Sequence, residues 1–380
     1  MPRDKNFKGL VRGRMAKTGE SYTTARSHLR TRVPDATGPT GGTDPDAAAL
    51  ARALAAAGVV DPATGRPLSP HLLFGTGGGI GFAYLVFAYP GWTNVHVDGR
   101  FNALYFEKAG FAETACARLG VRLRVQQLST VEIAERRLGQ ALEVGGEVML
   151  TLDLVRLPGH TPPVPAPYVP HHVTVTGDGD ALTVTGLTGG PVVMSLREVV
   201  EARWTGAKKY GGLFTVEAPG PAAHNLPVAI KLPDVVAAAT RRTAECLLEP
   251  SRTRFDGSFG VGGIRKWARL LTDDRDAKGW PRLFPDPDSR LRALASVARG
   301  LGGADPATAG ARWFYAAFLA ETGYPAAAVE AYRDLGRRWA ALAALAASPD
   351  ATGADLASHL PGLADAEESA ARALLAGGPR

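Results

Sequence analysis

Two neighbouring histidines, His171 and His172, are the residues of this chain whose surroundings best suit them to chemistry. They begin a stretch in which Val173 and Val175 alternate with threonines, which is the period-two pattern of a half-buried strand. An imidazole at the start of a strand can activate a nucleophilic cysteine when an acid on a neighbouring strand orients the ring. Such chemistry therefore needs a thiol and a carboxylate close to one of these rings.

The elements that would position the histidines are two short strands. Residues 170–186 predict a β-hairpin, because residues 177–180 (Gly-Asp-Gly-Asp) supply a turn and Leu182 and Val184 continue the alternation. The preceding residues, 158–170, are rich in proline and predict an irregular loop.

Thiols are scarce in this chain. Its two cysteines, Cys116 and Cys246, both lie among helix-forming residues. Two cysteines make neither a disulfide framework nor a metal cluster, and a thiol within a helix is usually a buried packing group. The sequence predicts no metal site and no cofactor.

A glycine-rich run, residues 75–81, raises the question of phosphate binding. A phosphate-binding loop of the P-loop type ends in Gly-Lys-Ser/Thr, but Gly81 is followed by Phe82. The dinucleotide fingerprint needs a glycine at its sixth position, and counting from Gly75 that position is Ile80. We expect these glycines to permit close packing of backbones.

Length and charge indicate a two-domain protein with a basic arm. The chain has 380 residues, more than a single hydrophobic core normally serves. Residues 1–32 hold nine basic and two acidic residues, a net charge of +7, and the remainder holds 34 basic and 35 acidic residues. Nucleic-acid binding is therefore expected, if at all, only through residues 1–32. Without an apolar membrane span or a signal peptide, a cytoplasmic protein is expected.

The predicted organisation is a basic arm at 1–32, a linker at 33–45, an α/β domain at 46–218 and an all-helical domain at 228–380. Alternating strand and helix patterns between residues 94 and 216 indicate the α/β layer. Helical patterns at 102–119 and 129–142 belong to that layer. The C-terminal helices are expected at 232–248, 262–271, 289–300, 308–322, 325–346 and 354–376.

Several stretches together resemble a known family. They are residues 68–84, 141–153 with Leu157-Pro158, 171–187, and 260–267 with 312–319. In this order they resemble the N-terminal-domain family of the butirosin-biosynthesis acyltransferase (BtrH-like), followed by the helical domain of unknown function that accompanies it. The resemblance implies a papain-like or C39-peptidase-like α+β fold. It also implies transfer of an acyl group from an acyl carrier protein to a small-molecule amine.

The chain departs from that family at the catalytic positions. In active relatives a cysteine starts the first core helix, and here that place is Gly-Thr-Asp-Pro-Asp at 42–46, around Asp44. By its spacing to Gly177, the matching histidine is His171, and the orienting acid falls on Gly186. One member of the triad is retained, so His171 is the candidate catalytic residue.

Three functions follow as hypotheses. The first is a catalytically degenerate papain-like protein that binds a partner or a small molecule in a biosynthetic pathway. The second is an active acyltransferase or amidase with a non-standard nucleophile. The third is a DNA-binding regulator that acts through residues 1–32. An active site would place His171 within hydrogen-bond reach of a cysteine, serine or threonine side chain.

Overall fold

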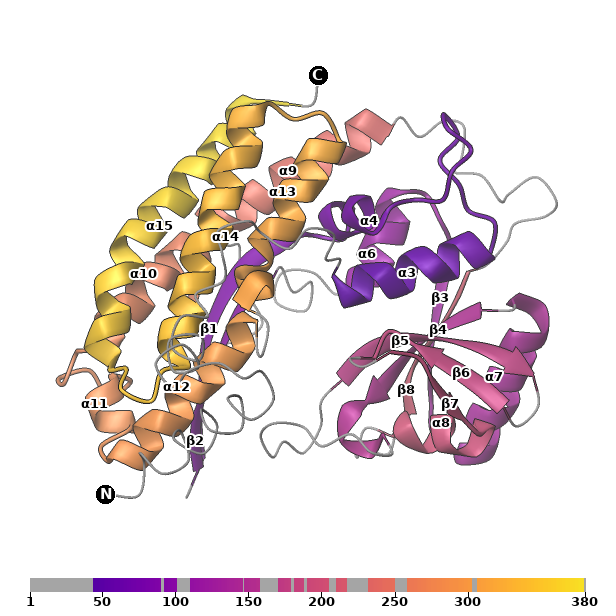
Figure 1. Ribbon diagram of the computed structural model, residues 1–380, viewed down its shortest axis with the longest axis horizontal. Helices are drawn as coiled ribbons and strands as arrows, with labels where there is room; N and C mark the ends of the chain where they lie inside the picture. Colours follow the sequence, from indigo (N-terminus) through magenta and orange to yellow (C-terminus); the bar gives the residue numbers. More distant parts are fainter. Residues whose placement is uncertain are drawn as a thin grey trace, which may run out of the picture.

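The chain folds into an α+β part followed by a helical part, as the sequence predicts (Figure 1). The structure, a computed structural model, describes residues 44–89, 92–100, 110–145, 147–157, 170–178, 181–187, 190–204, 210–216, 232–249, 258–302 and 306–378. The basic arm, almost all of the linker and most of the proline-rich loop lie outside these residues.

A six-stranded sheet forms the centre of the α+β part. Its strand order is β3-β8-β4-β5-β6-β7, and every pairing between neighbours is antiparallel. The strands are β3 (Leu123–Leu128), β4 (Glu147–Asp153), β5 (Pro170–Asp178), β6 (Ala181–Thr185), β7 (Val192–Met194) and β8 (Tyr210–Val216). Hairpin and long-range antiparallel pairing explains why the alternation of strands and helices in the sequence does not produce a parallel sheet.

The predicted hairpin of β5 and β6 is confirmed, with Val175 opposite Val184. Val173 and Val175 are buried in a core that the sheet shares with α7 (Val131–Gly145) and α8 (Leu196–Ala202). Thr174 points to the other face, where it accepts a hydrogen bond from Arg52 of α3 (Pro45–Ala56). The two faces of β5 therefore meet different helices.

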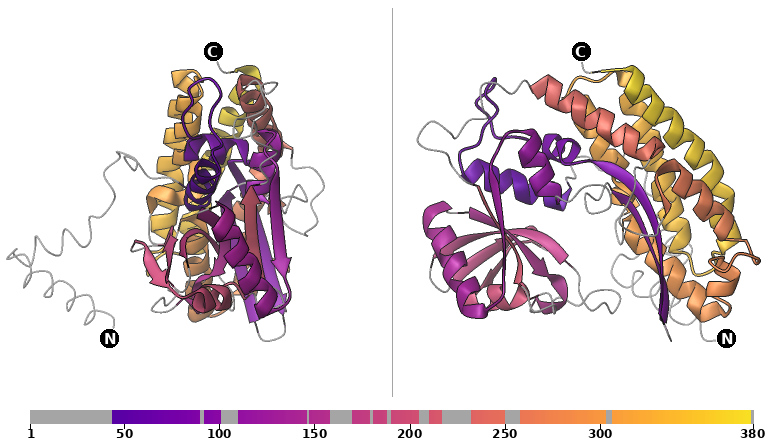
Figure 2. Two further views of the ribbon diagram at one scale, coloured as in Figure 1. Left: turned by 90° about the vertical axis from the view of Figure 1, so that its right-hand side faces the viewer. Right: turned by 180° about the vertical axis from the view of Figure 1, so that it is seen from behind.

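A second hairpin, which the sequence only hinted at, lies along the helical part (Figure 2). It consists of β1 (Ile80–Tyr89) and β2 (Trp92–Arg100), and β1 also pairs with β9 (Ser258–Phe259). The strand pattern that the sequence predicts from residue 94 onward covers part of β2 and none of β1. Residues 82–85 are all buried, so β1 has no alternation of apolar and polar residues to reveal it.

The helical part contains all six predicted helices, with shifts of a few residues at their ends. They are α9 (Leu232–Leu248), α10 (Gly260–Leu270), α12 (Pro287–Leu301), α13 (Arg312–Glu321), α14 (Ala326–Ala346) and α15 (Gly353–Ala376). The short elements α11 (Trp280–Leu283) and η2 (Pro306–Ala311) connect them. Among the described helices, none combines the length and the apolar character that crossing a membrane requires.

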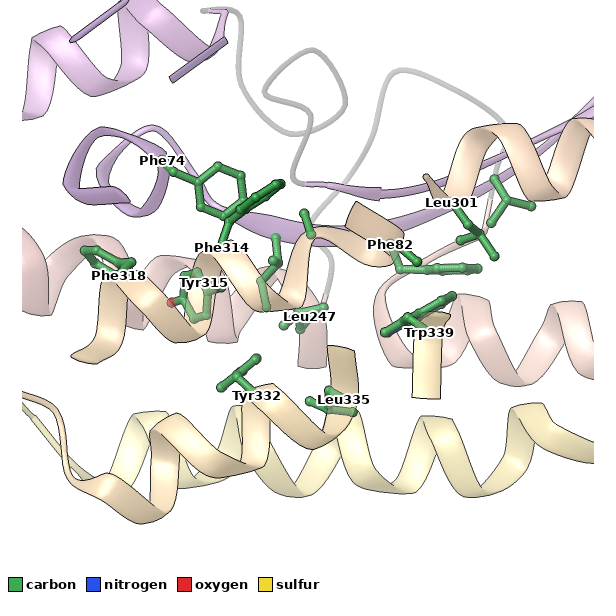
Figure 3. Close-up of a cluster of buried hydrophobic side chains, with 14 of the residues drawn as sticks. Phe74, Phe82, Leu247, Leu301, Phe314, Tyr315, Phe318, Tyr332, Leu335 and Trp339 are labelled. Carbon is green, nitrogen blue, oxygen red and sulfur yellow. The ribbon is translucent and has the colours of Figure 1, made fainter. Parts of the chain in front are cut away.

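The larger hydrophobic core joins the two parts of the chain. It contains α3, α4 (Pro70–Thr76), β1, β2 and the C-terminal helices. Its aromatic centre is drawn in Figure 3, where Phe82 of β1 lies against Trp339 of α14. The ring centroids of Phe82 and Trp339 are 5.8 Å apart, and those of Phe82 and Trp267 are 6.0 Å apart. The proposed boundary near residues 218–228 thus does not separate two independent cores.

The glycine-rich run packs closely against this core, as expected. A methyl group added at Gly75 would lie 2.3 Å from the ring of Phe318, and one at Gly79 would lie 2.7 Å from Tyr315. Gly79 also has a φ of +61°, a conformation that glycine adopts without strain.

Of the helix expected at 102–119, the structure describes only the part from residue 110 onward. The helix α6 covers only Phe111–Arg118, and residues 101–109 lie outside the described part. Gly110 is its N-cap residue and donates its backbone N–H to the carboxylate of Glu113. The apolar spacing that suggested a longer helix did not reveal this local start.

Candidate functional site

Helix α3 begins at the position where the resemblance expects a nucleophile. Asp44 is its N-cap residue, and one carboxylate oxygen accepts a hydrogen bond of 3.0 Å from the backbone N–H of Ala47. Pro45 occupies the first helical turn, where its missing N–H costs nothing. The sequence Asp-Pro-Asp therefore starts this helix for structural reasons.

Arg100, the last residue of β2, binds both acidic residues of that first turn. Its Nη2 lies 3.1 Å from Oδ1 of Asp44, and its Nη1 lies 2.8 Å from Oδ2 of Asp46. The guanidinium carbon also lies 5.9 Å from the ring centroid of Phe74 and 5.8 Å from that of Phe111. One cation thus connects two carboxylates and rests between two aromatic rings.

His172 completes the arrangement from the sheet. Its Nδ1 lies 2.9 Å from Oδ1 of Asp46, and its ring packs edge-on against Phe214 with centroids 5.4 Å apart. The side chain is 25 % exposed. We call His172, Asp46, Arg100 and Asp44 together the α3 charge network.

The pKa values of the two carboxyl groups in the α3 charge network are shifted in opposite directions. Burial acts to raise the pKa of Asp46, but the charge of Arg100 and the hydrogen bond from His172 outweigh it and hold that pKa well below its usual range. Burial raises the pKa of Asp44, because the single contact with Arg100 does not compensate for it. Burial also disfavours the charged form of Arg100, yet its carboxylate neighbours raise its pKa.

The structure gives the two histidines different neighbours. The Nε2 of His171 lies 2.8 Å from the backbone carbonyl oxygen of Gly186, so the pairing of positions 171 and 186 exists, but through the backbone and without a carboxylate. By the alternation of β5, His171 shares its face with Val173, which packs toward α7 and α8.

The ring that reaches the start of α3 is therefore His172, not His171. The spacing to Gly177 matched His171 to the histidine of the family, and its catalytic role stays a prediction. A one-residue difference moves a side chain to the opposite face of a strand, and the spacing alone does not fix the face.

Within the described part of the chain, neither thiol is hydrogen-bonded to His171 or His172. Cys116 on α6 and Cys246 on α9 are buried, with 1 % and 2 % exposure. Burial, aided by the charge of Glu113, raises the pKa of Cys116 to about 12, which disfavours the thiolate. In the described part of the chain, no cysteine, serine or threonine side chain is hydrogen-bonded to His171 or His172.

Within the same residues, no three histidine, cysteine or acidic side chains are grouped so that they could hold a metal ion. The side chains of the α3 charge network can recognise charge and exchange protons. Among the described residues, only Asp46 is hydrogen-bonded to the ring of His172, through Nδ1.

A small cavity adjoins the α3 charge network. Its volume is about 200 Å³, and it lies where the start of α3 and the end of β2 meet the C-terminal end of α12 and the start of α13. The residues lining it include Asp44, Asp98, Arg100, Arg299 and Phe314. Ligand sites often form at such junctions between domains.

The fold and the site define a protein with an α+β domain and a helical domain packed against it. The α3 charge network lies at the start of the first described helix of the α+β domain. Residues 46–185 match the family model described as Butirosin biosynthesis protein H, N-terminal, and residues 212–374 match a domain of unknown function, DUF4872. The chain therefore carries the N-terminal domain of the butirosin biosynthesis protein H family, followed by this second domain. Comparison with curated proteins gave no match.

Sequence reasoning missed two members of the α3 charge network. Arg100 is 54 residues from Asp46, and no local pattern links them. His172 lies one position after His171, the predicted catalytic residue, so the strand pattern places it on the opposite face of β5. The period-two pattern identified both faces of β5, but only the position of α3 shows which face meets the helix start.

Proposed function

We propose that this protein is a catalytically degenerate member of a papain-like family that binds a small molecule or a partner in a biosynthetic pathway. The observation that carries this proposal is the ion pair of Asp44 and Arg100 at the start of α3. A family enzyme that works through a thioester needs a thiolate at this helix start. Here the position holds a capping carboxylate.

The carboxylates of the α3 charge network are poor substitutes for a thiolate. Asp46 is bound to Arg100 and His172, and both contacts stabilise its charge and lower its basicity. Asp44 is 2 % exposed and engaged by the backbone N–H of Ala47. Cys116 lies on another helix with a pKa raised to about 12. A protein so arranged retains the binding surface of the family and not its covalent step.

The test is a turnover assay with acyl-carrier-protein thioesters and a panel of amines. Wild type, His171→Ala and His172→Ala are compared, with folding of each checked by circular dichroism. We expect near-background transfer that is equal in all three proteins. Transfer well above background in wild type, lost in one of the variants, would overturn the proposal.

One observation favours a second candidate function. The Nδ1 of His172 is held by Asp46, while its Nε2 has no hydrogen-bond partner in the described part of the chain. This is the arrangement of a general base that an acid orients. In that case an incoming amine is itself the nucleophile: it attacks the thioester carbonyl, His172 takes its proton, and the proton passes to the departing thiolate. This candidate predicts that transfer is lost in His172→Ala and kept in His171→Ala.

A further inference from the structure

The cavity beside the α3 charge network is lined by residues of both segments that match family models. Asp98 and Arg100 come from the end of β2, inside the first matched segment, and Arg299 and Phe314 come from α12 and α13, inside the second. A ligand there would contact both domains at once. The cavity volume is about 200 Å³, several times what a single water molecule needs.

Within the described part of the chain, some charged residues that line this cavity are paired and others are not. Arg100 is paired with Asp44 at 3.1 Å and with Asp46 at 2.8 Å. Asp98 and Arg299 remain, and in the described part of the chain neither forms an ion pair with the other or with a third residue. Among the described residues, Asp98 is hydrogen-bonded only through Oδ1, which accepts a bond of 2.8 Å from the backbone N–H of Arg100.

Backbone packing keeps these two charged residues near each other. A methyl group added at Gly300 would lie 1.9 Å from the carbonyl oxygen of Val97, so α12 and β2 touch through their backbones at this point. Arg299 precedes Gly300 and Asp98 follows Val97, which places both side chains beside the same contact. Opposite charges that line one cavity without pairing can each accept one end of a ligand.

Two further features add polarity to the cavity. Helix α12 ends here, and the carbonyl groups of its last turn favour a positive charge. Arg100 also lines the cavity, and its two Nη atoms are held by Asp44 and Asp46. The lining therefore offers an acceptor-rich side at the end of α12, and Arg299 is the donor for an anion.

We propose that this cavity binds a small zwitterion of amino-acid size, with its carboxylate on Arg299 and its ammonium group on Asp98 and the carbonyl end of α12. This inference rests on the proposed function, since it names the ligand class of a protein that binds a small molecule.

The experiment is isothermal titration calorimetry of the full chain with unbranched zwitterions from glycine to 5-aminopentanoate. Carboxylates and amines of the same lengths serve as single-charge probes. We expect one zwitterion length to bind best and at least tenfold more tightly than either single-charge probe of that length. Arg299→Gln and Asp98→Asn should each weaken binding at least tenfold, and the asparagine keeps the acceptor for Arg100.

The matched control is Arg292→Gln, which changes an exposed arginine on the same helix that does not line the cavity. It should bind the zwitterion as wild type does. Absence of zwitterion binding to wild type, equal binding of the single-charge probes, or equal loss in Arg292→Gln would each overturn the inference. The turnover assay is independent of this outcome: a protein that neither transfers acyl groups nor binds zwitterions contradicts only the ligand class.

Discussion

The Nδ1 of His172 lies 2.9 Å from Oδ1 of Asp46, so a strand of the six-stranded sheet is joined to the first turn of helix α3. The same carboxylate binds Arg100 at the end of β2. Asp46 therefore ties together three elements that are distant in sequence, which gives it a structural role that can be measured.

Replacing Asp46 with asparagine should destabilise the fold at neutral pH by about 2–3 kcal/mol, because charge-assisted hydrogen bonds to Arg100 and His172 are lost. The folded-state pKa of Asp46 lies below its unfolded value of about 3.9. Its stabilising contribution is thus complete above about pH 4 and is lost as the pH falls below that value. Urea unfolding across this range should show the acid-dependent loss in wild type and a smaller one in Asp46→Asn. An equal loss in both proteins would contradict the assignment.

Asp44 should give the opposite pH dependence. Burial raises its folded-state pKa, so the native state holds the proton more tightly and stability declines as the pH rises from about 4 through the folded pKa. Asparagine caps helices as well as aspartate does. Asp44→Asn should therefore show a weaker decline over this range in the same urea series. If the stability of Asp44→Asn declined more steeply with pH than that of wild type, the charge of Arg100 would outweigh burial and lower the pKa of Asp44.

Arg312 should be the most sensitive charged residue of the helical part. It is fully buried and donates to Glu367 at 2.7 Å and to backbone carbonyls of Gly81, Gly99 and Gly310. Arg312→Met leaves the buried Glu367 without its cation and should cost about 3–5 kcal/mol of unfolding free energy. Chemical denaturation measures the difference.

Two controls accompany that measurement. Arg265, 48 % exposed, pairs with Glu368, and Arg265→Met should cost less than about 1 kcal/mol. The double variant Arg312→Met/Glu367→Met should be less destabilised than Arg312→Met, because no unpaired charge remains buried. Equal losses in Arg312→Met and Arg265→Met would contradict a special role for the buried pair.

The glycine-rich run should respond to added volume and not to phosphate. A methyl group at position 75 would lie 2.3 Å from the Phe318 ring, so Gly75→Ala should destabilise the protein by about 1–3 kcal/mol. Gly139 lies within α7, and a methyl group there meets nothing within 4 Å. Gly139→Ala should stabilise by about 0.5–1 kcal/mol through helix propensity. Thermal unfolding compares the two, and similar shifts in the same direction would count against close packing at Gly75.

Both thiols should be unreactive in the folded protein. Cys116 and Cys246 are buried, and burial raises the pKa of Cys116 to about 12. At about pH 8, a thiol reagent should label neither residue before unfolding and both in urea. Rapid labelling of one thiol in the native protein would reveal a reactive cysteine that the geometry does not account for.

Much of the fold was predictable from local patterns. The alternation at Val173 and Val175 predicts the hairpin, and apolar spacing predicts the C-terminal helices. Ser69 and Ser195 cap the helices that follow them. These signals are local because a helix start or a hairpin turn uses residues only a few positions apart.

The site was less predictable, because its contacts join distant segments. The ion pairs of Arg100 depend on how β2 packs beside α3, and no periodicity encodes that. The choice between His171 and His172 depends on which face of β5 meets α3. The strand β1, in which residues 80–85 are all buried, lacks the alternation by which a strand is recognised there. Its pairing with β9 spans the expected domain boundary.

The most direct test of the central claim is intact-protein mass spectrometry after incubation with an acyl thioester donor at neutral pH. The account predicts no covalent acyl adduct on wild type, because the start of α3 carries the Asp44–Arg100 pair in place of a thiol. A stoichiometric adduct on native wild type that disappears in Cys116→Ser would contradict the account.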